Sequence, residues 1–188
     1  MSRLTRKSPT SVIIDGEEYP INTDFRDCLN TVIALGDPKL SSSEKVEIIL
    51  WNLYDEPPSN YEEAIKQAIW FLACGKDLDE KEVQQKLCDF EQDGDYIYSA
   101  LLKKGVDLDR VDDLHWWTFM SHFSEVPESQ FTRIVYLRSQ SQKGKLTKDE
   151  RKECARIGWD VINMVDEETK QQTKKDKEIF EKYFDGEE

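Results

Sequence analysis

The sequence has few of the residues that build metal sites or disulfide frameworks. Its 188 residues include two histidines and four cysteines. The cysteines lie far apart and no two form a C-x-x-C pair, so zinc spacing is absent; they are Cys28, Cys74, Cys88 and Cys154. The basic start, residues 1–7, has no apolar stretch behind it that would make a signal peptide. No apolar run approaches the roughly 20 residues of a membrane span. We therefore expect a reduced protein of the cytoplasm.

The short motifs of common enzymes and nucleotide-binding proteins are also missing. There is no G-x-S-x-G turn around a nucleophilic serine, no phosphate-binding G-x-x-x-x-G-K-[ST] loop and no G-x-G-x-x-G. None of the four cysteines has a histidine nearby in sequence. We therefore expect no catalysis and no cofactor. A small enzyme whose site no motif reveals stays open as an alternative.

Two groups of metal-binding residue types have simpler interpretations. The stretch Asp89–Asp95 imitates the start of a calcium loop, but position 12, which must be glutamate, is Ala100. An acidic helix start completed by Gly94 is favoured. His115 and His122 are seven residues apart, which separates them by about 10 Å along a helix axis, too far for one ion to bind both. We expect them to border an aromatic helix face, and we expect no metal site.

Positive charge is scarce: 39 acidic residues face 26 basic ones, and the formal net charge is −13. Polyanions would be repelled, so we expect no nucleic-acid partner. The charge fits a soluble cytosolic protein, a partner of a basic protein, or a nucleic-acid mimic.

Most of the chain has helical patterns, and Ser11–Ile21 is the one strand-like segment. There Asp15-Gly16 predicts a hairpin turn that lets Val12 and Ile14 pair with Tyr19 and Ile21. The predicted helices run from a Thr23 cap to Gly36, from a Ser41/Glu44 capping box to Leu53, from Ser59 or Asn60 to Gly75, from about Phe90 to Lys103, from an Asp109 or Asp112 cap to Phe123, from Pro127 to Leu137, and from a Thr147/Glu150 capping box to Val165.

These elements predict a mainly α fold: a helical bundle with a short N-terminal β-hairpin and a charged C-terminal helical extension. We expect residues 1–10 to be a flexible N-terminus, residues 11–165 the helical domain, and residues 166–188 a charged tail, helical or disordered. The acidic stretch Asp77–Glu82 is expected to be a linker or a first helical turn. Residues 166–178 contain no apolar side chain, whereas Ile179, Phe180, Tyr183 and Phe184 recur at helical spacing and make the end amphipathic.

The run Leu114–Phe123 contains two adjacent tryptophans, Trp116 and Trp117. Neighbours on a helix point about 100° apart, so both rings cannot occupy one narrow stripe. An arc of about 160° is covered by Trp116, Trp117, Phe119, Met120 and Phe123. Such a helix needs more than one packing partner. It is either central in an all-helical domain, or it keeps part of its aromatic surface for another protein. We expect Trp117 to be buried, and Trp116 and Phe119 to lie nearer a partner.

Three segments resemble the phage Gp15 family, which is found in long-tailed phages and prophages of Gram-positive bacteria. They are Tyr19–Arg26; Phe90–Ala100, followed by Gly105–Leu108; and Leu114–Phe119, followed by Phe131–Ile134 and Arg138. Order and spacing match over roughly residues 10–150, and His-Trp-Trp-x-Phe is the most specific part. The tail lies outside the resemblance.

The resemblance implies a role in tail assembly, because such proteins are usually encoded between the tail-tube and tape-measure genes. It implies a non-catalytic tail assembly chaperone, or its downstream-frame partner, that coats the apolar helices of the tape-measure protein in the host bacterial cytoplasm and is absent from the mature virion. The tape-measure protein or another tail-assembly protein is the expected partner, with self-association possible and no membrane partner. The expected partner-binding residues are Trp116, Phe119, Phe123, Phe180 and Phe184.

One further alternative comes from the charge. The chain could be a phage protein that binds a host defence protein through its acidic surface, and so inhibits or triggers it.

Overall fold

The protein is mainly α-helical, as predicted, with one two-stranded antiparallel sheet at the N-terminus. The computed structural model describes residues 3–76 and 86–164. The predicted linker at Asp77–Glu82 and the predicted tail at 166–188 lie outside these residues. The described elements are a 3₁₀ turn η1 (Arg3–Thr5), the strands β1 (Ser11–Ile14) and β2 (Glu17–Pro20), and the helices α1 (Phe25–Gly36), α2 (Ser42–Leu53), α3 (Tyr61–Leu72), α4 (Gly94–Lys103), α5 (Trp116–Ser124), α6 (Gln130–Gln142), α7 (Lys148–Ile157) and α8 (Trp159–Asn163).

The predicted hairpin is confirmed, but the expected partner of Ile14 is wrong. Val12 lies opposite Tyr19, as expected, but Ile14 lies opposite Glu17 because Asp15 and Gly16 alone form the turn. Ile21 follows the end of β2 and is buried together with Val12 and Ile14. A two-stranded ribbon is marginal alone, and here β1 packs against α3.

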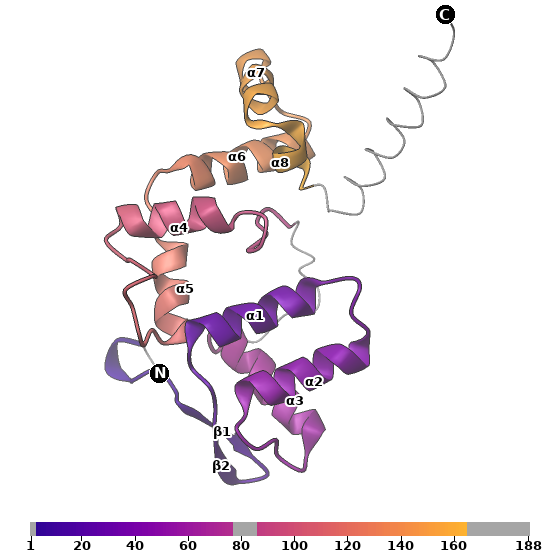
Figure 1. Ribbon diagram of the computed structural model, residues 1–188, viewed down its shortest axis with the longest axis vertical. Coiled ribbons are helices and arrows are strands. Elements are labelled where there is room, and N and C mark those ends of the chain that lie inside the picture. The colour runs from indigo at the N-terminus through magenta and orange to yellow at the C-terminus, as the bar shows by residue number, and fades with distance from the viewer. Residues whose placement is uncertain (1–2, 77–85, 165–188) are drawn as a thin grey trace, which may run out of the picture.

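The helices form a stack in which α5 joins two groups (Figure 1). The hairpin and α1 to α3 lie at one end, with α2 packed against both α1 and α3. The other end contains α4 and α6 to α8, where α6 packs on α4 and on α8. Because α5 packs against both α1 and α4, it is the central helix of the fold.

Two capping boxes were predicted and are confirmed, because their side chains satisfy the free N–H groups of a helix start. Ser41 and Glu44 begin α2, and Thr147 and Glu150 begin α7. The N-cap of α3 is Asn60, which is one of the two residues predicted to begin this helix.

The predicted starts of four other helices were wrong. Asp24, not Thr23, caps α1; His115, not an aspartate, caps α5; and α6 begins after Ser129 rather than at Pro127. The predicted helix from Phe90 begins at Gly94, after a turn.

The predicted last helix is interrupted. Gly158 has φ +118°, a conformation that L-residues avoid, and it separates α7 from α8. Trp159 and Ile162 therefore do not continue the face of α7: Ile162 is buried and Trp159 is 41% exposed.

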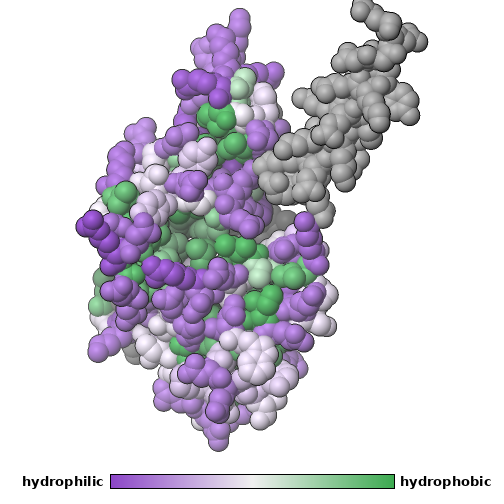
Figure 2. Space-filling model, in the orientation of Figure 1, coloured by the Kyte–Doolittle hydropathy of each residue, from purple (hydrophilic) through white to green (hydrophobic). Residues whose placement is uncertain are grey.

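Two apolar clusters form the interior. The larger one contains side chains of the hairpin and of α1 to α5, together with Phe131 at the start of α6. The smaller one contains Ile134, Leu137, Cys154 and Ile162, from α6, α7 and α8. Figure 2 shows a mostly hydrophilic surface, with hydrophobic residues gathered across the middle of the face in view. Among the described residues, no helix has the length and apolarity that crossing a membrane requires.

Candidate functional site

The aromatic helix α5 starts beside the start of α1, because backbone hydrogen bonds join the two helix starts. The amide of Phe25 donates to the carbonyl of Leu114, and that of Trp116 donates to the carbonyl of Thr23, at 3.1 and 2.7 Å. The Nδ1 atom of His115 accepts from the amide of Trp117 at 3.0 Å, so the histidine side chain caps α5.

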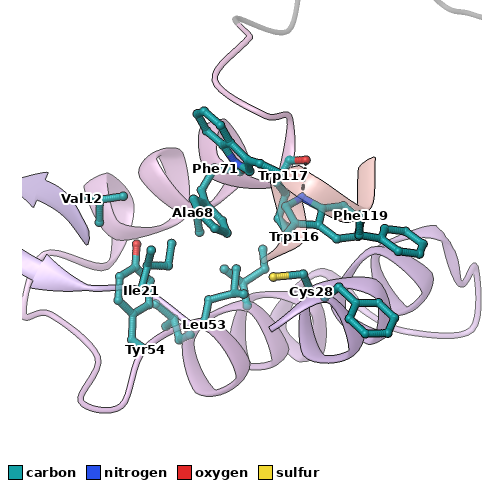
Figure 3. Close-up of a cluster of buried hydrophobic side chains, with 14 of the residues drawn as sticks. Val12, Ile21, Cys28, Leu53, Tyr54, Ala68, Phe71, Trp116, Trp117 and Phe119 are labelled. Carbon is teal, nitrogen blue, oxygen red and sulfur yellow. Dashed lines mark hydrogen bonds between the residues drawn. The ribbon is translucent and has the colours of Figure 1, made fainter. Parts of the chain in front are cut away.

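Both tryptophans close the C-terminal end of α3. The indole N–H of Trp116 donates to the carbonyl of Leu72 at 2.9 Å, and that of Trp117 donates to the carbonyl of Phe71 at 2.8 Å (Figure 3). The last carbonyls of a helix have no amide partner one turn further along the helix. The Trp116 indole supplies a donor to the Leu72 carbonyl, and the Trp117 indole adds a second donor to the Phe71 carbonyl, which also accepts from the amide of Cys74 at 3.0 Å. The paired tryptophans therefore fix the end of one helix against the start of another.

Stacked rings continue along α5 away from the tryptophans. Phe119 lies between Phe25 and Trp116, with ring centroids at 5.0 and 5.6 Å. Phe123 contacts Phe90 and Phe131, with ring centroids at 5.1 and 5.7 Å. Residues of α1, α3, α6 and the turn before α4 thus cover the wide apolar arc. Of the two explanations for this arc, the structure supports a central helix.

The expected exposure of Trp116 and Phe119 is therefore wrong. Each is 1% exposed and Trp117 is fully buried, because α1 and α3 cover both sides of the helix. Phe123 is half-buried. Phe180 and Phe184 lie outside the described residues. Contact of these five residues with a partner stays a prediction; for Trp116 and Phe119 it would require the core to open.

The two histidines do not face each other across a binding site. His115 contacts the carbonyl of Pro9 through Nε2, at 2.9 Å, as well as capping α5. With Nδ1 accepting from an amide, Nε2 carries the proton and donates, which is the neutral tautomer. The carbonyl of His122 accepts from the Lys104 ammonium at 3.2 Å. Within residues 3–76 and 86–164, no group of three His, Cys, Asp or Glu side chains could hold a metal ion.

Three of the four cysteines, Cys28, Cys88 and Cys154, are poorly suited to act as nucleophiles. All four are thiols, and Cys28 and Cys154 are buried. Burial raises the pKa of the Cys28 and Cys154 thiols, and it raises the pKa of Cys88 to about 12. The reactive form of cysteine is the thiolate, which such values disfavour near neutral pH.

The acidic stretch that imitates a calcium loop binds an arginine instead. The Asp93 carboxylate accepts from both terminal nitrogens of Arg138, at 2.6 and 2.8 Å, and both side chains are fully buried. Arg138 also donates to the carbonyls of Leu87 and Val161, so all five of its N–H groups are used. The pair joins α6 and α8 to the turn before α4.

One apolar groove lies on the surface along α2 and the loop into α3. It encloses about 500 Å³, and its apolar lining is contributed by Val46, Leu50, Trp51, Pro57 and Tyr61. Trp51 is 70% exposed and Tyr61 is 55% exposed. Most of this lining lies on one face of α2, at positions 43, 46, 47, 50 and 51. This α2 groove is the candidate contact site.

Comparison with known proteins identifies the family. The Bacteriophage Gp15 protein family matches residues 4–162, most of the chain. The chain belongs to this family. Neither the curated proteins nor the solved structures contain a match. The resemblance noted from the His-Trp-Trp-x-Phe run is thereby confirmed, and in this Gp15 protein that run builds the core rather than an exposed surface.

Sequence reasoning missed Trp51 and the Arg138–Asp93 pair. The helix was predicted from Ser41 to Leu53, but no role was predicted for its tryptophan, which lies next to the buried Leu50. An apolar residue outside the buried stripe of an amphipathic helix is the signal that would have found it. No local pattern links Asp93 to Arg138, because 45 residues separate them.

Proposed function

We propose that this phage protein is a tail assembly chaperone that binds the tape-measure protein during tail morphogenesis, without catalysis. The observation that carries the proposal is the family match over residues 4–162, which makes the chain a phage protein. The gene order implied by the family resemblance indicates the tape-measure protein as the client.

The surface of the protein supports such a role. A chaperone that holds an apolar client must itself stay soluble, and a net charge of −13 opposes self-aggregation. It must also offer apolar contact area, which the α2 groove supplies through Trp51 and Tyr61. The buried aromatic core contributes a rigid frame for this surface.

Co-expression with a fragment of the tape-measure protein from the same phage tests the proposal. We expect the fragment to stay soluble and to elute with the chaperone in size-exclusion chromatography. A fragment that is equally insoluble with and without the chain, or that elutes separately, would exclude the role. Alanine at Trp116 or Phe119 is unsuitable for this test, because loss of a buried ring would unfold the protein.

The proposed role also places the protein in the host cytoplasm and leaves it out of the finished particle. Quantitative mass spectrometry of purified virions and of infected-cell lysate tests this point. We expect peptides of the chain in the lysate and a strongly reduced amount, relative to the tube protein, in virions. A fixed ratio to the tube protein in the virion would instead indicate a structural component.

A further inference from the structure

The α2 groove has an apolar floor and an exposed aromatic edge. Leu50 is buried and forms part of the floor, while Trp51, next in sequence, points about 100° away and is 70% exposed. Tyr61 at the start of α3 and Pro57 in the loop before it complete the lining. Tryptophan and tyrosine are enriched among the residues that dominate binding at protein interfaces.

The surroundings of the groove are strongly acidic. Residues 41–63 contain six acidic side chains against one basic side chain, Lys45; the acids are Glu44, Glu47, Asp55, Glu56, Glu62 and Glu63. Glu62 pairs with Lys66, and Glu44 accepts from Ser41. Glu47, Asp55 and Glu56 are exposed and form no ion pair within the part of the chain that the structure describes. Three carboxylates beside an apolar groove favour a partner that carries both apolar and basic side chains.

Charge argues against two other occupants. The chain's own C-terminal segment, residues 165–188, contains nine acidic and five basic residues, a net charge of −4. A second copy of the chain would bring another net charge of −13 to the contact and, in a symmetric dimer, would place the two acidic rims together. Both arrangements are repulsive.

We propose that the α2 groove binds one amphipathic helix whose apolar face is flanked by lysine and arginine, with Trp51 as its anchor. From Ser43 to Trp51 the lining extends over eight residue steps, or about 12 Å, which equals about two turns of a bound helix. Such a helix contributes apolar anchors at i, i+3 or i+4, and i+7. The inference rests on the proposed function for the identity of the protein that carries the helix; the groove and its chemistry stand without it.

Synthetic peptides test the groove directly against the full-length chain. The first peptide has about 18 residues, with leucine along one helical face and lysine elsewhere. The second has glutamate in place of lysine, and the third has the first peptide's composition in a scrambled order. By isothermal titration calorimetry we expect binding of the first alone. Trp51→Ala should weaken it at least about tenfold, whereas the control Trp159→Ala, at a tryptophan that is 41% exposed on α8, should not.

Reversing the charge of the carboxylates beside the α2 groove tests whether the bound helix must be basic. Glu47→Lys/Glu56→Lys should weaken the lysine peptide and allow the glutamate peptide to bind. Equal binding of the amphipathic and scrambled peptides, or no effect of Trp51→Ala, would overturn the inference. So would a wild-type dimer that Trp51→Ala converts to monomer, which would identify a second copy as the occupant. Stronger peptide binding by Phe180→Asp/Phe184→Asp would identify the chain's own tail.

The same variants separate the groove from the chaperone role. If the tape-measure fragment binds the wild type and Trp51→Ala equally, the α2 groove is not the site that binds the tape-measure protein, and the chaperone role stands. If the lysine peptide binds through Trp51 but the tape-measure fragment does not bind, the role is wrong and the groove stands.

Discussion

The packing of α5 against the end of α3 depends on single residues. Gly75 follows α3 with φ +75°, and a Cβ at this position would lie 2.9 Å from Cη2 of Trp117. The tryptophan occupies this space because its indole N–H reaches back to the carbonyl of Phe71. A glycine is thus required both by the backbone conformation and by the ring beside it.

Gly75→Ala should destabilise the protein by about 2–4 kcal/mol, because backbone strain and overlap with Trp117 add. Gly105→Ala is the matched control: Gly105 has φ +90°, but nothing lies within 4 Å of its Cβ position, so a loss of about 1 kcal/mol is expected. Urea unfolding of the two variants measures the difference. Equal losses would show that the contact with Trp117 is unimportant.

The buried Arg138–Asp93 ion pair is a second contact between single residues that stabilises the fold. Arg138→Met should cost about 3–5 kcal/mol, because the Asp93 carboxylate and the carbonyls of Leu87 and Val161 lose their donor. Arg133→Met, on the same helix, is the control; its pair with Glu153 is partly exposed and should contribute less than about 1 kcal/mol.

A double-mutant cycle isolates the charge effect. Arg138→Met/Asp93→Asn should be more stable than Arg138→Met alone, because asparagine leaves no unpaired buried charge. Denaturant unfolding of Arg138→Met, Asp93→Asn and the double variant gives the three free-energy losses that the cycle compares. If the double variant is less stable by the sum of the two single losses, the two side chains are not coupled.

Residue-scale prediction from the sequence had a clear limit. The helical angle between Trp116 and Trp117 correctly indicated that one neighbour could not cover both rings. It could not show which side chains would cover them. The covering residues Phe25, Phe71 and Leu72 belong to α1 and α3, each 44 or more residues away from α5 in the sequence. Trp116 was therefore expected near a partner, whereas the chain itself covers it.

At the scale of elements, helix starts marked by Ser or Thr with Glu three residues later were predictable, whereas the Ser129/Thr132 box that begins α6 lacks that glutamate and was missed. The Ser41/Glu44 and Thr147/Glu150 boxes follow from local chemistry alone. The start of α5 does not: His115 caps it because the backbone bridge to Asp24 fixes its position, and that bridge is a tertiary contact. The break at Gly158 was missed because glycine within a helical pattern is only a weak signal.

The docking of α7 should depend on pH. Hydrogen bonds from Thr147 lower the pKa of Glu150, and hydrogen bonds from Arg133 lower the pKa of Glu153. A lowered carboxylate pKa stabilises the fold above the unfolded value of about 4.3 and loses this contribution as pH falls through the folded-state pKa. Helix α7 should therefore loosen on acidification.

Amide exchange of α7, followed by NMR from about pH 6 to about pH 3 after correction for intrinsic rates, measures the effect. We expect its protection to fall with pH in the wild type and to depend much less on pH in Glu150→Gln/Glu153→Gln. Identical pH profiles for the two proteins would assign the loosening to other groups.

At the scale of the whole molecule, the sequence predicted the fold class, the hairpin and the family, but not the division of the core. Composition and periodicity indicate how much of the chain is helical and which residues are apolar. They do not indicate that Ile134 and Leu137 of α6 belong to a different cluster from Phe131 of the same helix. That division depends on the angle at which α6 crosses α4 and α8, which only tertiary packing determines.

The two clusters differ greatly in size, and their stabilities should differ as well. Four buried side chains hold α7 and α8 to α6, whereas the larger cluster spans the hairpin and five helices. Opening of α7 and α8 alone exposes little apolar surface, although Arg138 must release the carbonyl of Val161. We expect α7 and α8 to open as a unit at a free energy at least about 2 kcal/mol below that of α1 and α5.

Native-state hydrogen exchange with one substitution in each cluster tests this division. Ile162→Ala should lower protection in α7 and α8 by about 2–4 kcal/mol and leave the slowest amides of α1 unchanged, because the smaller cluster can open without the larger. Leu53→Ala, in the larger cluster, should lower the protection of those slowest amides instead. If Ile162→Ala lowers protection in α1 as much as in α8, the molecule unfolds as one cooperative unit. The Arg138–Asp93 pair would then be the contact that couples the two clusters, because it ties α8, which belongs to the smaller cluster, to the turn before α4, whose buried side chains belong to the larger one.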